Sequence, residues 1–223
     1  HLIKKHISIS NNTKMLDLAC GKGAVSVNIC KELNIETKGI DIIPEFIDYA
    51  KEKAIEYGVQ NRCKFEVEDI NKAVQKEKEY DIVIFGAAED ILGTPFETLQ
   101  KLKQTVKENG YILIDEAYVE TKNQNVKYET YEYLTLDEWK ELFKNTNLKL
   151  IETLKAEENM QKEMNDYNTN KIVKRAEELI KKYPSKKKLF EEYIENQKAE
   201  SEDLQENIVG VTWILQRGKD YDK

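Results

Sequence analysis

The chain has 223 residues and a formal net charge of −7; it is 40% hydrophobic and 35% charged, with only 3 prolines. This composition excludes a disordered chain and indicates a folded domain with a very polar surface. Lysine is abundant but alternates with glutamate, without the basic surplus or stripe of most nucleic-acid binders. We therefore expect no nucleic-acid partner.

Membrane insertion, secretion and metal binding are not expected either. No apolar run approaches the ~18 residues needed to cross a bilayer, and the segment HLIKKHISIS lacks the apolar core and cleavage site of a signal peptide. The cysteines Cys20, Cys30 and Cys63 show no CxxC spacing, and the chain has only 2 histidines. A Cys/His metal site is therefore not predicted, and the odd number of cysteines fits a reducing, cytoplasmic location.

Short apolar runs alternate with amphipathic stretches from residue 14 to about residue 155. Asn109 and Gly110 are predicted to form a turn. The alternation indicates an α/β fold, a doubly wound and mostly parallel sheet with helices on both faces. In chain order, the predicted elements are strand 15–19, helix 24–33, strand 37–41, helix 44–57, strands 63–67 and 80–85, helix 95–107, strand 111–115, helix 136–143 and strand 148–154.

Residues 156–207 interrupt this alternation. They are rich in Glu, Lys and Asn, and two apolar stripes at helical spacing, separated at Pro184, predict two helices before a last strand at 208–216. We interpret residues 1–223 as a single domain with 156–207 as a helical insertion. The insertion is predicted either to cap the substrate pocket or to pack on the sheet edge or on another subunit, and both a monomer and a homodimer remain open.

A glycine-rich turn follows the first predicted strand. The run Cys20-Gly21-Lys22-Gly23 connects strand 15–19 to the next helix. Glycines permit a tight turn there and let a ligand approach the free N–H groups at the start of the helix. This arrangement is typical of sites for nucleotide-like cofactors.

Two acids lie at the ends of the next two predicted strands. Asp41 lies 18 residues after Gly23, where a carboxylate can accept hydrogen bonds from both hydroxyls of a ribose. Asp69 follows the third strand, where it could accept from an adenine amino group while Ile70 packs on the ring. Three strand ends of the expected type strengthen the prediction of a cofactor site.

Asp17 distinguishes between two classes of cofactor. The dinucleotide fingerprint GxGxxG has Ser26 at its third glycine position here, which does not exclude a dinucleotide. An acid inside the first strand would be repelled by a pyrophosphate but attracted by the ammonium and sulfonium groups of S-adenosylmethionine. Asp17 therefore favours S-adenosylmethionine, and an NAD(P)-dependent oxidoreductase on a related fold stays the alternative.

Four segments resemble motifs of the class I S-adenosylmethionine-dependent methyltransferases: LDLACGKG, GIDIIPEFIDYAKEKA, VEDI and YDIVIFGAA. The resemblance covers roughly residues 14–116, and the segments GAAEDI and IDEAYV are, more loosely, similar to a bacterial group of small-molecule methyltransferases. The resemblance implies a Rossmann-like seven-stranded sheet of strand order 3-2-1-4-5-7-6, with strand 7 antiparallel and the helical insertion before it.

The resemblance also implies a cofactor site. The methionine amino group would lie near Asp17, and many family members have glycine where this chain has Ala19. Ile42 would lie beside the adenine, and Phe85 and Gly86 would border the sulfonium. The full set of implied cofactor-binding residues is Asp17, Ala19, Cys20, Gly21, Gly23, Asp41, Ile42, Asp69, Ile70, Phe85 and Gly86.

Catalytic groups are poorly determined by the sequence, because the sulfonium methyl is already activated and the protein mainly supplies alignment and desolvation. Glu89 and Glu116, after the fourth and fifth strands, are the candidates for orienting or deprotonating the substrate nucleophile. The segment FGAAED lacks the NPPY-type motif used on the amino groups of bases, so we expect a small-molecule substrate. A non-catalytic, cofactor-binding regulatory module is the remaining alternative.

Overall fold

The computed structural model describes residues 1–223 except 87, 89, 123–126, 128–132 and 220–223. The chain divides into two compact units, and each is described separately below. Within the described residues, no helix is long and apolar enough to cross a membrane. Unit 1 comprises His1–Glu116, Lys140–Thr153 and Thr212–Lys223, and unit 2 comprises Ala117–Trp139 and Leu154–Val211.

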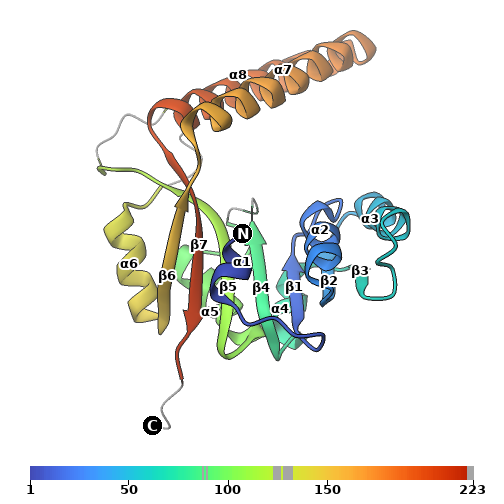
Figure 1. The fold of residues 1–223 in the computed structure, drawn as a ribbon. Helices are drawn as coiled ribbons and strands as arrows, with labels where there is room; N and C mark the ends of the chain where they lie inside the picture. Colours follow the sequence, from blue (N-terminus) through green and yellow to red (C-terminus); the bar gives the residue numbers. More distant parts are fainter. Residues whose placement is uncertain (87, 89, 123–126, 128–132, 220–223) are drawn as a thin grey trace. The chain divides into compact units, whose positions relative to one another are not determined.

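The chain forms a seven-stranded sheet of order β3-β2-β1-β4-β5-β7-β6, with β7 antiparallel (Figure 1). In the parallel part, Asp17 lies in register with Gly39 on one neighbouring strand and with Ile84 on the other. This topology confirms the fold class indicated by the sequence. The strands are β1 (Lys14–Leu18), β2 (Glu36–Asp41), β3 (Cys63–Val67), β4 (Tyr80–Gly86), β5 (Val106–Tyr118), β6 (Leu148–Lys155) and β7 (Val209–Arg217).

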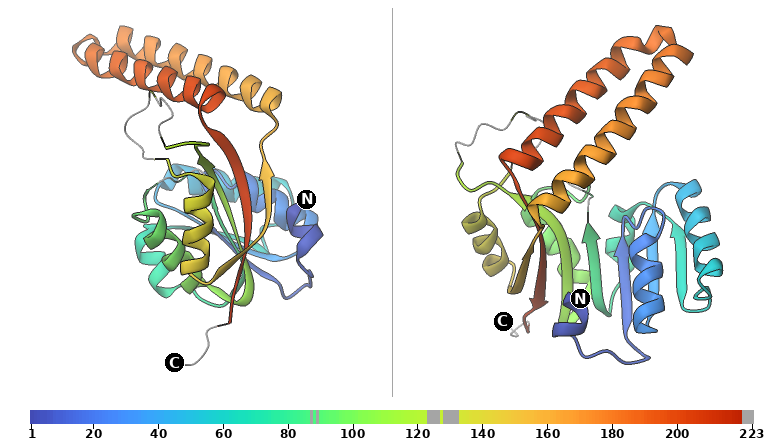
Figure 2. Two further views of the ribbon diagram at one scale, coloured as in Figure 1. Left: turned by 90° about the vertical axis from the view of Figure 1, so that its left-hand side faces the viewer. Right: turned by 45° about the horizontal axis from the view of Figure 1, so that its top comes forward.

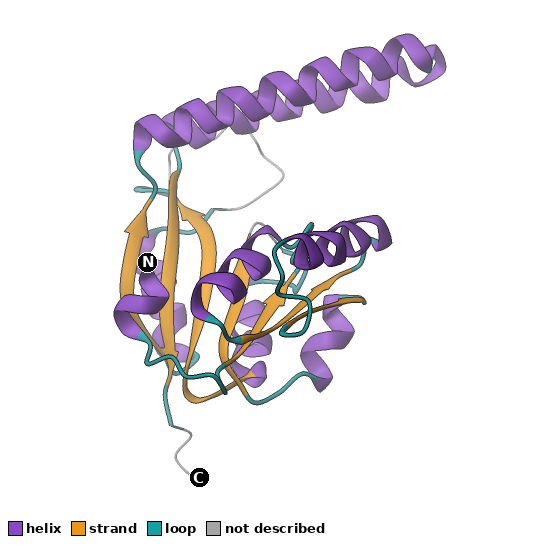
Figure 3. Ribbon diagram, turned by 45° about the vertical axis from the view of Figure 1, so that its right-hand side comes forward, coloured by secondary structure: helices purple, strands orange, loops and turns teal. Residues whose placement is uncertain are grey.

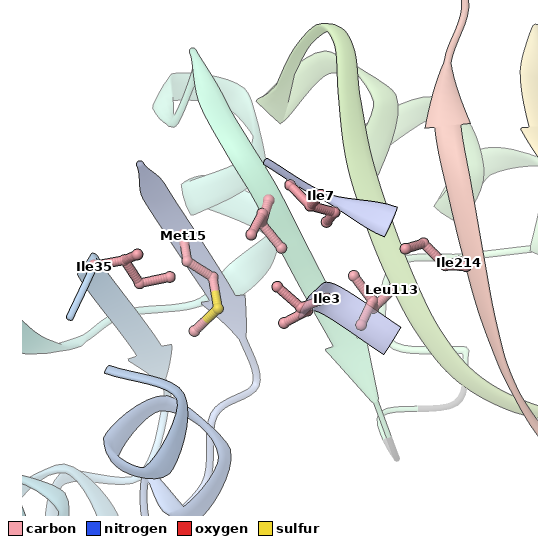
Figure 4. Packing of buried hydrophobic residues seen from close by; sticks show 7 residues of the cluster. Ile3, Ile7, Met15, Ile35, Leu113 and Ile214 are labelled. Carbon is pink, nitrogen blue, oxygen red and sulfur yellow. The ribbon is translucent and has the colours of Figure 1, made fainter. Parts of the chain in front are cut away.

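Two helices, α1 (Leu2–His6) and α2 (Ala24–Leu33), cover one face of the sheet. The buried side chains of Ile3 and Ile7 pack with Met15 of β1 and Ile214 of β7, as Figure 4 shows. Helix α1 was not predicted from the sequence, because a helix of only five residues gives no periodic signal. Its position is fixed by this packing and by Lys5, whose Nζ lies 2.7 Å from the Glu152 carboxylate on β6.

Three more helices flank the sheet in unit 1: α3 (Pro44–Glu56), α4 (Ile70–Lys76) and α5 (Pro95–Thr105). The apolar positions Ile47, Ala50 and Ala54 of α3 pack with Cys63 and Phe65 of β3. Helices α4 and α5 contact each other and lie on the face opposite α1 (Figure 2). The sequence analysis also missed the short helix α4, which begins directly after Asp69.

The boundary between α5 and β5 differs from the prediction. The helix ends at Thr105 rather than at residue 107, and the strand starts at the buried, β-branched Val106. Arg217 Nη1 donates to the carbonyls of Lys103 and Val106, at 3.1 and 2.6 Å, and so satisfies groups at the end of the helix. The predicted turn at Asn109 is a strand irregularity instead: Asn109 has a φ of +59°, and the β4–β5 register shifts nearby.

Unit 2 contains the whole of the predicted helical insertion, residues 156–207. Helices α7 (Glu158–Lys182) and α8 (Lys187–Glu206) are joined by the short 3-10 helix η1 (Pro184–Lys186), so the predicted break at Pro184 is confirmed (Figure 3). Helix α6 (Leu136–Asn145) begins with a reciprocal cap in which Glu138 Oε2 accepts from the Thr135 N–H at 2.9 Å.

Candidate functional site

The loop between β1 and α2 turns sharply. Three of its residues have left-handed backbone conformations: Ala19 (φ +58°), Gly21 (φ +53°) and Gly23 (φ +74°). The Cys20 N–H donates to the Ile40 carbonyl of β2 at 3.0 Å, and the Gly23 N–H donates to the Cys20 carbonyl at 2.9 Å. The loop is therefore held against the end of β2. Because Ala19 has the backbone conformation that glycine adopts most easily, the structure explains why glycine is common at this position in the resembling family.

The glycines of this region have different functions. A Cβ on Gly23 would come within 2.8 Å of both Ala50 and Phe65, so Gly23 allows α2 to start close to its neighbours. A Cβ on Gly39 of β2 would lie 2.6 Å from Phe65 and 2.9 Å from the Sγ of Cys20, so Gly39 makes room for both side chains. At Gly21, by contrast, a Cβ would have no other atom within 4 Å, so a ligand can approach this part of the backbone.

Asp41, at the end of β2, binds the glycine loop directly. Its Oδ2 accepts from the Gly21 N–H at 2.9 Å, and its Oδ1 accepts from the Ile43 N–H at 3.0 Å. The carboxylate thus fixes both the loop and the start of α3. The side chain of the intervening residue, Ile42, is 64% exposed and offers an apolar surface beside this carboxylate.

Asp17 is buried inside β1, with only 4% of its surface exposed. Its Oδ2 accepts from the Ser26 hydroxyl on the first turn of α2 at 2.5 Å, and the Ser26 N–H also donates to the carboxylate. Burial raises the pKa of Asp17 to about 6, although the two Ser26 hydrogen bonds act in the opposite direction. The nearby charge of Asp41 raises the pKa further. A cation placed here would restore the ionised form.

The remaining predicted cofactor residues lie on β4 and after β3. Asp69 caps α4, because its Oδ1 accepts from the Asn71 N–H at 2.9 Å. Ile70 is only 5% exposed, so its predicted contact with an adenine ring stays a prediction. Phe85 is buried, while Gly86 is half-exposed beside Asp115 of β5.

Of the two catalytic candidates, Glu116 is half-buried and follows Asp115, the residue in register with Gly86. The other candidate, Glu89, lies outside the described residues. Among the residues that the structure describes, no group of three His, Cys, Asp or Glu side chains could hold a metal ion.

The carboxyl ends of β1, β2 and β4 bring together Asp17, Gly21, Asp41 and Gly86. They lie at the edge of the sheet where open α/β sheets bind ligands.

Comparison with known proteins identifies the family of this chain. The family model described as "Methyltransferase domain" matches residues 9–198. The chain belongs to the methyltransferase domain family. This result confirms the family resemblance of the four sequence motifs, and it assigns the chain to the methyltransferase domain family rather than to the oxidoreductases on a related fold.

The individual relatives of this chain are distant in sequence. It is 27% identical to phosphoethanolamine N-methyltransferase of Plasmodium falciparum over 74% of this chain and 61% of the relative, so the chain spans less than two thirds of that curated relative. The structure of a SAM-dependent methyltransferase of Thiobacillus denitrificans in complex with S-adenosyl-L-homocysteine is similar, with a TM-score of 0.75, 21% identity, and 93% and 86% of the two chains covered. YjhP of Escherichia coli has a TM-score of 0.79, 20% identity, and 98% and 91% coverage.

Two residues of the candidate site were not predicted from the sequence. Ser26 was considered only as the third position of a glycine fingerprint, yet its side chain is buried and bonded to Asp17. A small polar residue among the apolar positions of the first helix was the available signal. Gly39 begins one of the quoted motifs but was given no function, because the need for glycine there arises from the close approach of Cys20 and Phe65 in three dimensions.

Proposed function

We propose that this methyltransferase binds S-adenosylmethionine at the carboxyl ends of β1, β2 and β4 and transfers its methyl group to a small-molecule nucleophile. The observation that carries the proposal is the buried carboxylate of Asp17 beside an open glycine turn that Asp41 holds in place. This arrangement combines an acceptor for a cation with a backbone that a ligand can approach.

The chemistry of the residues fits this cofactor. The raised pKa of Asp17 reflects the burial of its carboxylate, and the amino group of the cofactor's methionine part would supply a compensating cation. Each Asp41 oxygen accepts one backbone N–H, and since a carboxylate oxygen has two lone pairs, both oxygens can still accept from a ribose hydroxyl. A pyrophosphate would place negative charge near the Asp17 carboxylate, which disfavours a dinucleotide, whereas Asp41 fits a ribose of either cofactor.

The residues of this chain have binding and orienting functions in the proposed reaction. When bound, S-adenosylmethionine supplies a methyl group on a sulfonium that is already a good leaving group. Asp17 holds the ammonium, the backbone of Ala19 and Gly21 contacts the methionine part, and Asp41 holds the ribose. Holding both reactants in line is the main contribution that the protein makes to such a reaction.

The remaining predicted residues complete the proposed site. The exposed Ile42 provides the apolar surface for the adenine, with Asp69 and Ile70 on its other side, and Gly86 borders the reacting centre. Glu116 is the proposed group for orienting or deprotonating the nucleophile. A Glu116→Gln variant that keeps full turnover would remove Glu116 from this function, and Glu89→Gln tests the second candidate in the same way.

Two observations support a small-molecule substrate. The P. falciparum relative is named for an acceptor of this class, phosphoethanolamine. The net charge of −7 gives no general attraction to the phosphates of a nucleic acid. We infer that the acceptor is a metabolite with a nucleophilic N, O, S or C atom.

Incubation with S-adenosylmethionine labelled in the methyl group tests this proposal. Extracted small metabolites, total RNA and total protein serve as separate acceptor pools, and Asp17→Asn is the matched inactive control. We expect label only in the metabolite pool, at a rate that the control loses by at least ~10-fold. Label in RNA or protein would contradict the substrate class, and no transfer to any pool would favour a non-catalytic regulatory module.

A further inference from the structure

Helices α7 and α8 lie side by side and form a helical hairpin, residues 158–206 (Figures 1 and 2). Two helices alone bury little between them. In the described range 162–206, Ala176 is the only buried apolar side chain, while the stripe residues Ile172, Leu179, Phe190 and Ile194 are only half-buried. The hairpin therefore leaves apolar surface that a further pair of helices could cover.

Larger apolar side chains are exposed at both ends of this hairpin. Met164 and Tyr167, 57% and 58% exposed, lie near the start of α7, at the end of the hairpin away from its turn. Tyr183, Leu189 and Tyr193, 43 to 60% exposed, lie at or near the turn. Each end of the hairpin therefore carries exposed apolar side chains that a partner could cover.

Charge is distributed unequally along the same hairpin. The basic tip, residues 171–192, has eight Lys and Arg against four Glu. The acidic base, residues 162–170 and 193–206, has seven Asp and Glu, of which only Asp203 is buried, against two Lys. Helix α7 has 25 residues, which makes it about 37 Å long at 1.5 Å per residue. The tip charges nearest η1, Lys181, Lys182 and Lys186, therefore lie beyond a Debye length of ~8 Å from the base of the same hairpin.

These observations define one complementary partner. Two copies of the hairpin placed antiparallel about a two-fold axis bring each basic tip against the acidic base of the other. The same placement brings the apolar group at each tip against the apolar group at each base. An unrelated acidic or basic partner would match only one end of the hairpin.

We propose that the helical hairpin is a homodimerisation surface, on which α7 and α8 of two chains form an antiparallel four-helix arrangement with tip against base. The sequence left three functions open for residues 156–207: a cap over the substrate pocket, packing on the sheet edge, or packing on another subunit. The proposed dimer is the third of these. The proposal is independent of the proposed function, because it uses no residue of the cofactor site.

Sedimentation velocity of the full chain tests this dimer. We expect a species of twice the 26.1 kDa chain mass whose dissociation constant rises by at least ~10-fold between about 0.05 M and about 0.5 M salt, since opposite charges would contribute to the contact. A monomer at all concentrations and salt levels would overturn the proposal.

Charge reversal identifies the surface. A tip variant, Lys174→Glu/Lys181→Glu, and a base variant, Glu163→Lys/Glu195→Lys, place like charges against each other, so each should dimerise at least ~10-fold more weakly than the natural chain. An equimolar mixture of the two variants should form heterodimers at close to natural affinity, because opposite charges again face each other. Recovery in the mixture shows that both variants are folded.

The matched control is Lys51→Glu/Lys72→Glu, which changes the net charge as the tip variant does but alters exposed residues on α3 and α4. It should leave the dimer unchanged. A dimer that survives both hairpin variants, or variants that weaken separately without recovery in the mixture, would overturn the proposal. A monomer whose tip binds anionic vesicles or RNA, and loses this binding on tip reversal, would also overturn it in favour of another partner.

Discussion

The hydroxyl of Ser26 donates a 2.5 Å hydrogen bond to the buried carboxylate of Asp17, joining the first turn of α2 to the carboxyl end of β1. The Ser26 hydrogen bonds stabilise the ionised form of Asp17 inside the protein, because they offset part of the free-energy cost of burying a charge. They also place that acid directly beneath the glycine turn. The stability and the ligand affinity of the protein should therefore both depend on pH through Asp17.

The first prediction concerns stability of the ligand-free protein. The pKa of Asp17 rises from 3.8 to about 6 on folding, so the folded state holds the proton more tightly than the unfolded state. The free energy of unfolding should therefore fall as the pH rises from about 4 to about 6, by roughly 3 kcal/mol from this residue. Urea unfolding at a series of pH values measures the effect. In Asp17→Asn this part of the pH dependence should be absent; an unchanged profile would contradict the assignment.

The second prediction concerns Ser26. Ser26→Ala removes a donor to a buried carboxylate and should lower the free energy of unfolding by about 1–3 kcal/mol near neutral pH. The loss should be smaller near pH 4.5, where Asp17 is protonated, because the hydrogen bond lowers its pKa by favouring the ionised form. Denaturant titrations at the two pH values give both numbers. Ser8→Ala, at an exposed position, is the control, and equal losses in the two variants would argue against a special role for Ser26.

The third prediction separates backbone strain from crowding. Gly23 and Gly58 have nearly the same φ, +74° and +72°, but only Gly23 has neighbours close to where a Cβ would lie. Gly58→Ala should cost about 1 kcal/mol for the left-handed backbone alone. Gly23→Ala should cost a further ~1–3 kcal/mol from overlap with Ala50 and Phe65. Equal melting temperatures for the two variants would show that the loop relaxes freely.

The fourth prediction reverses the usual effect of glycine. Ala19 has a φ of +58°, so Ala19→Gly relieves strain, and this gain should exceed the added entropy of the unfolded chain by up to about 1 kcal/mol. The matched variant Ala24→Gly, at the first position of α2, should lower stability instead. Thermal unfolding of both variants checks the signs, and a less stable Ala19→Gly protein would contradict the strain argument.

The sequence predicted the fold well wherever elements carry long periodic patterns. The bounds of α2 and β3 agree with prediction, and the strand order follows from family resemblance. Helices α1 and α4 were missed because five and seven residues give too few turns for a periodic signal. The α5–β5 boundary was wrong because the end of α5 is stabilised by Arg217, more than a hundred residues later in the chain.

The candidate site was predictable in part for a related reason. Asp17, Gly21 and Asp41 lie at strand ends that any parallel sheet brings to one edge. The hydrogen bonds between these residues could not be predicted from the sequence. The bond from Gly21 to Asp41 and the bond from Ser26 to Asp17 depend on the backbone conformation of the loop. Ile70 and Phe85 were predicted to contact the cofactor because they lie in family motifs. Both side chains are buried in the structure, and their contact with a cofactor stays a prediction.

The cofactor site is tested most directly by calorimetric titration of S-adenosylhomocysteine into the natural protein and into Asp17→Asn at about pH 7.5 and about pH 5. The natural protein should bind, and its affinity should fall by up to ~10-fold at the lower pH as Asp17 takes up a proton. Asp17→Asn should bind more weakly at the higher pH and should lack this pH dependence. Equal, pH-independent affinities for the two proteins, or binding of NADH in place of S-adenosylhomocysteine, would contradict the proposed site.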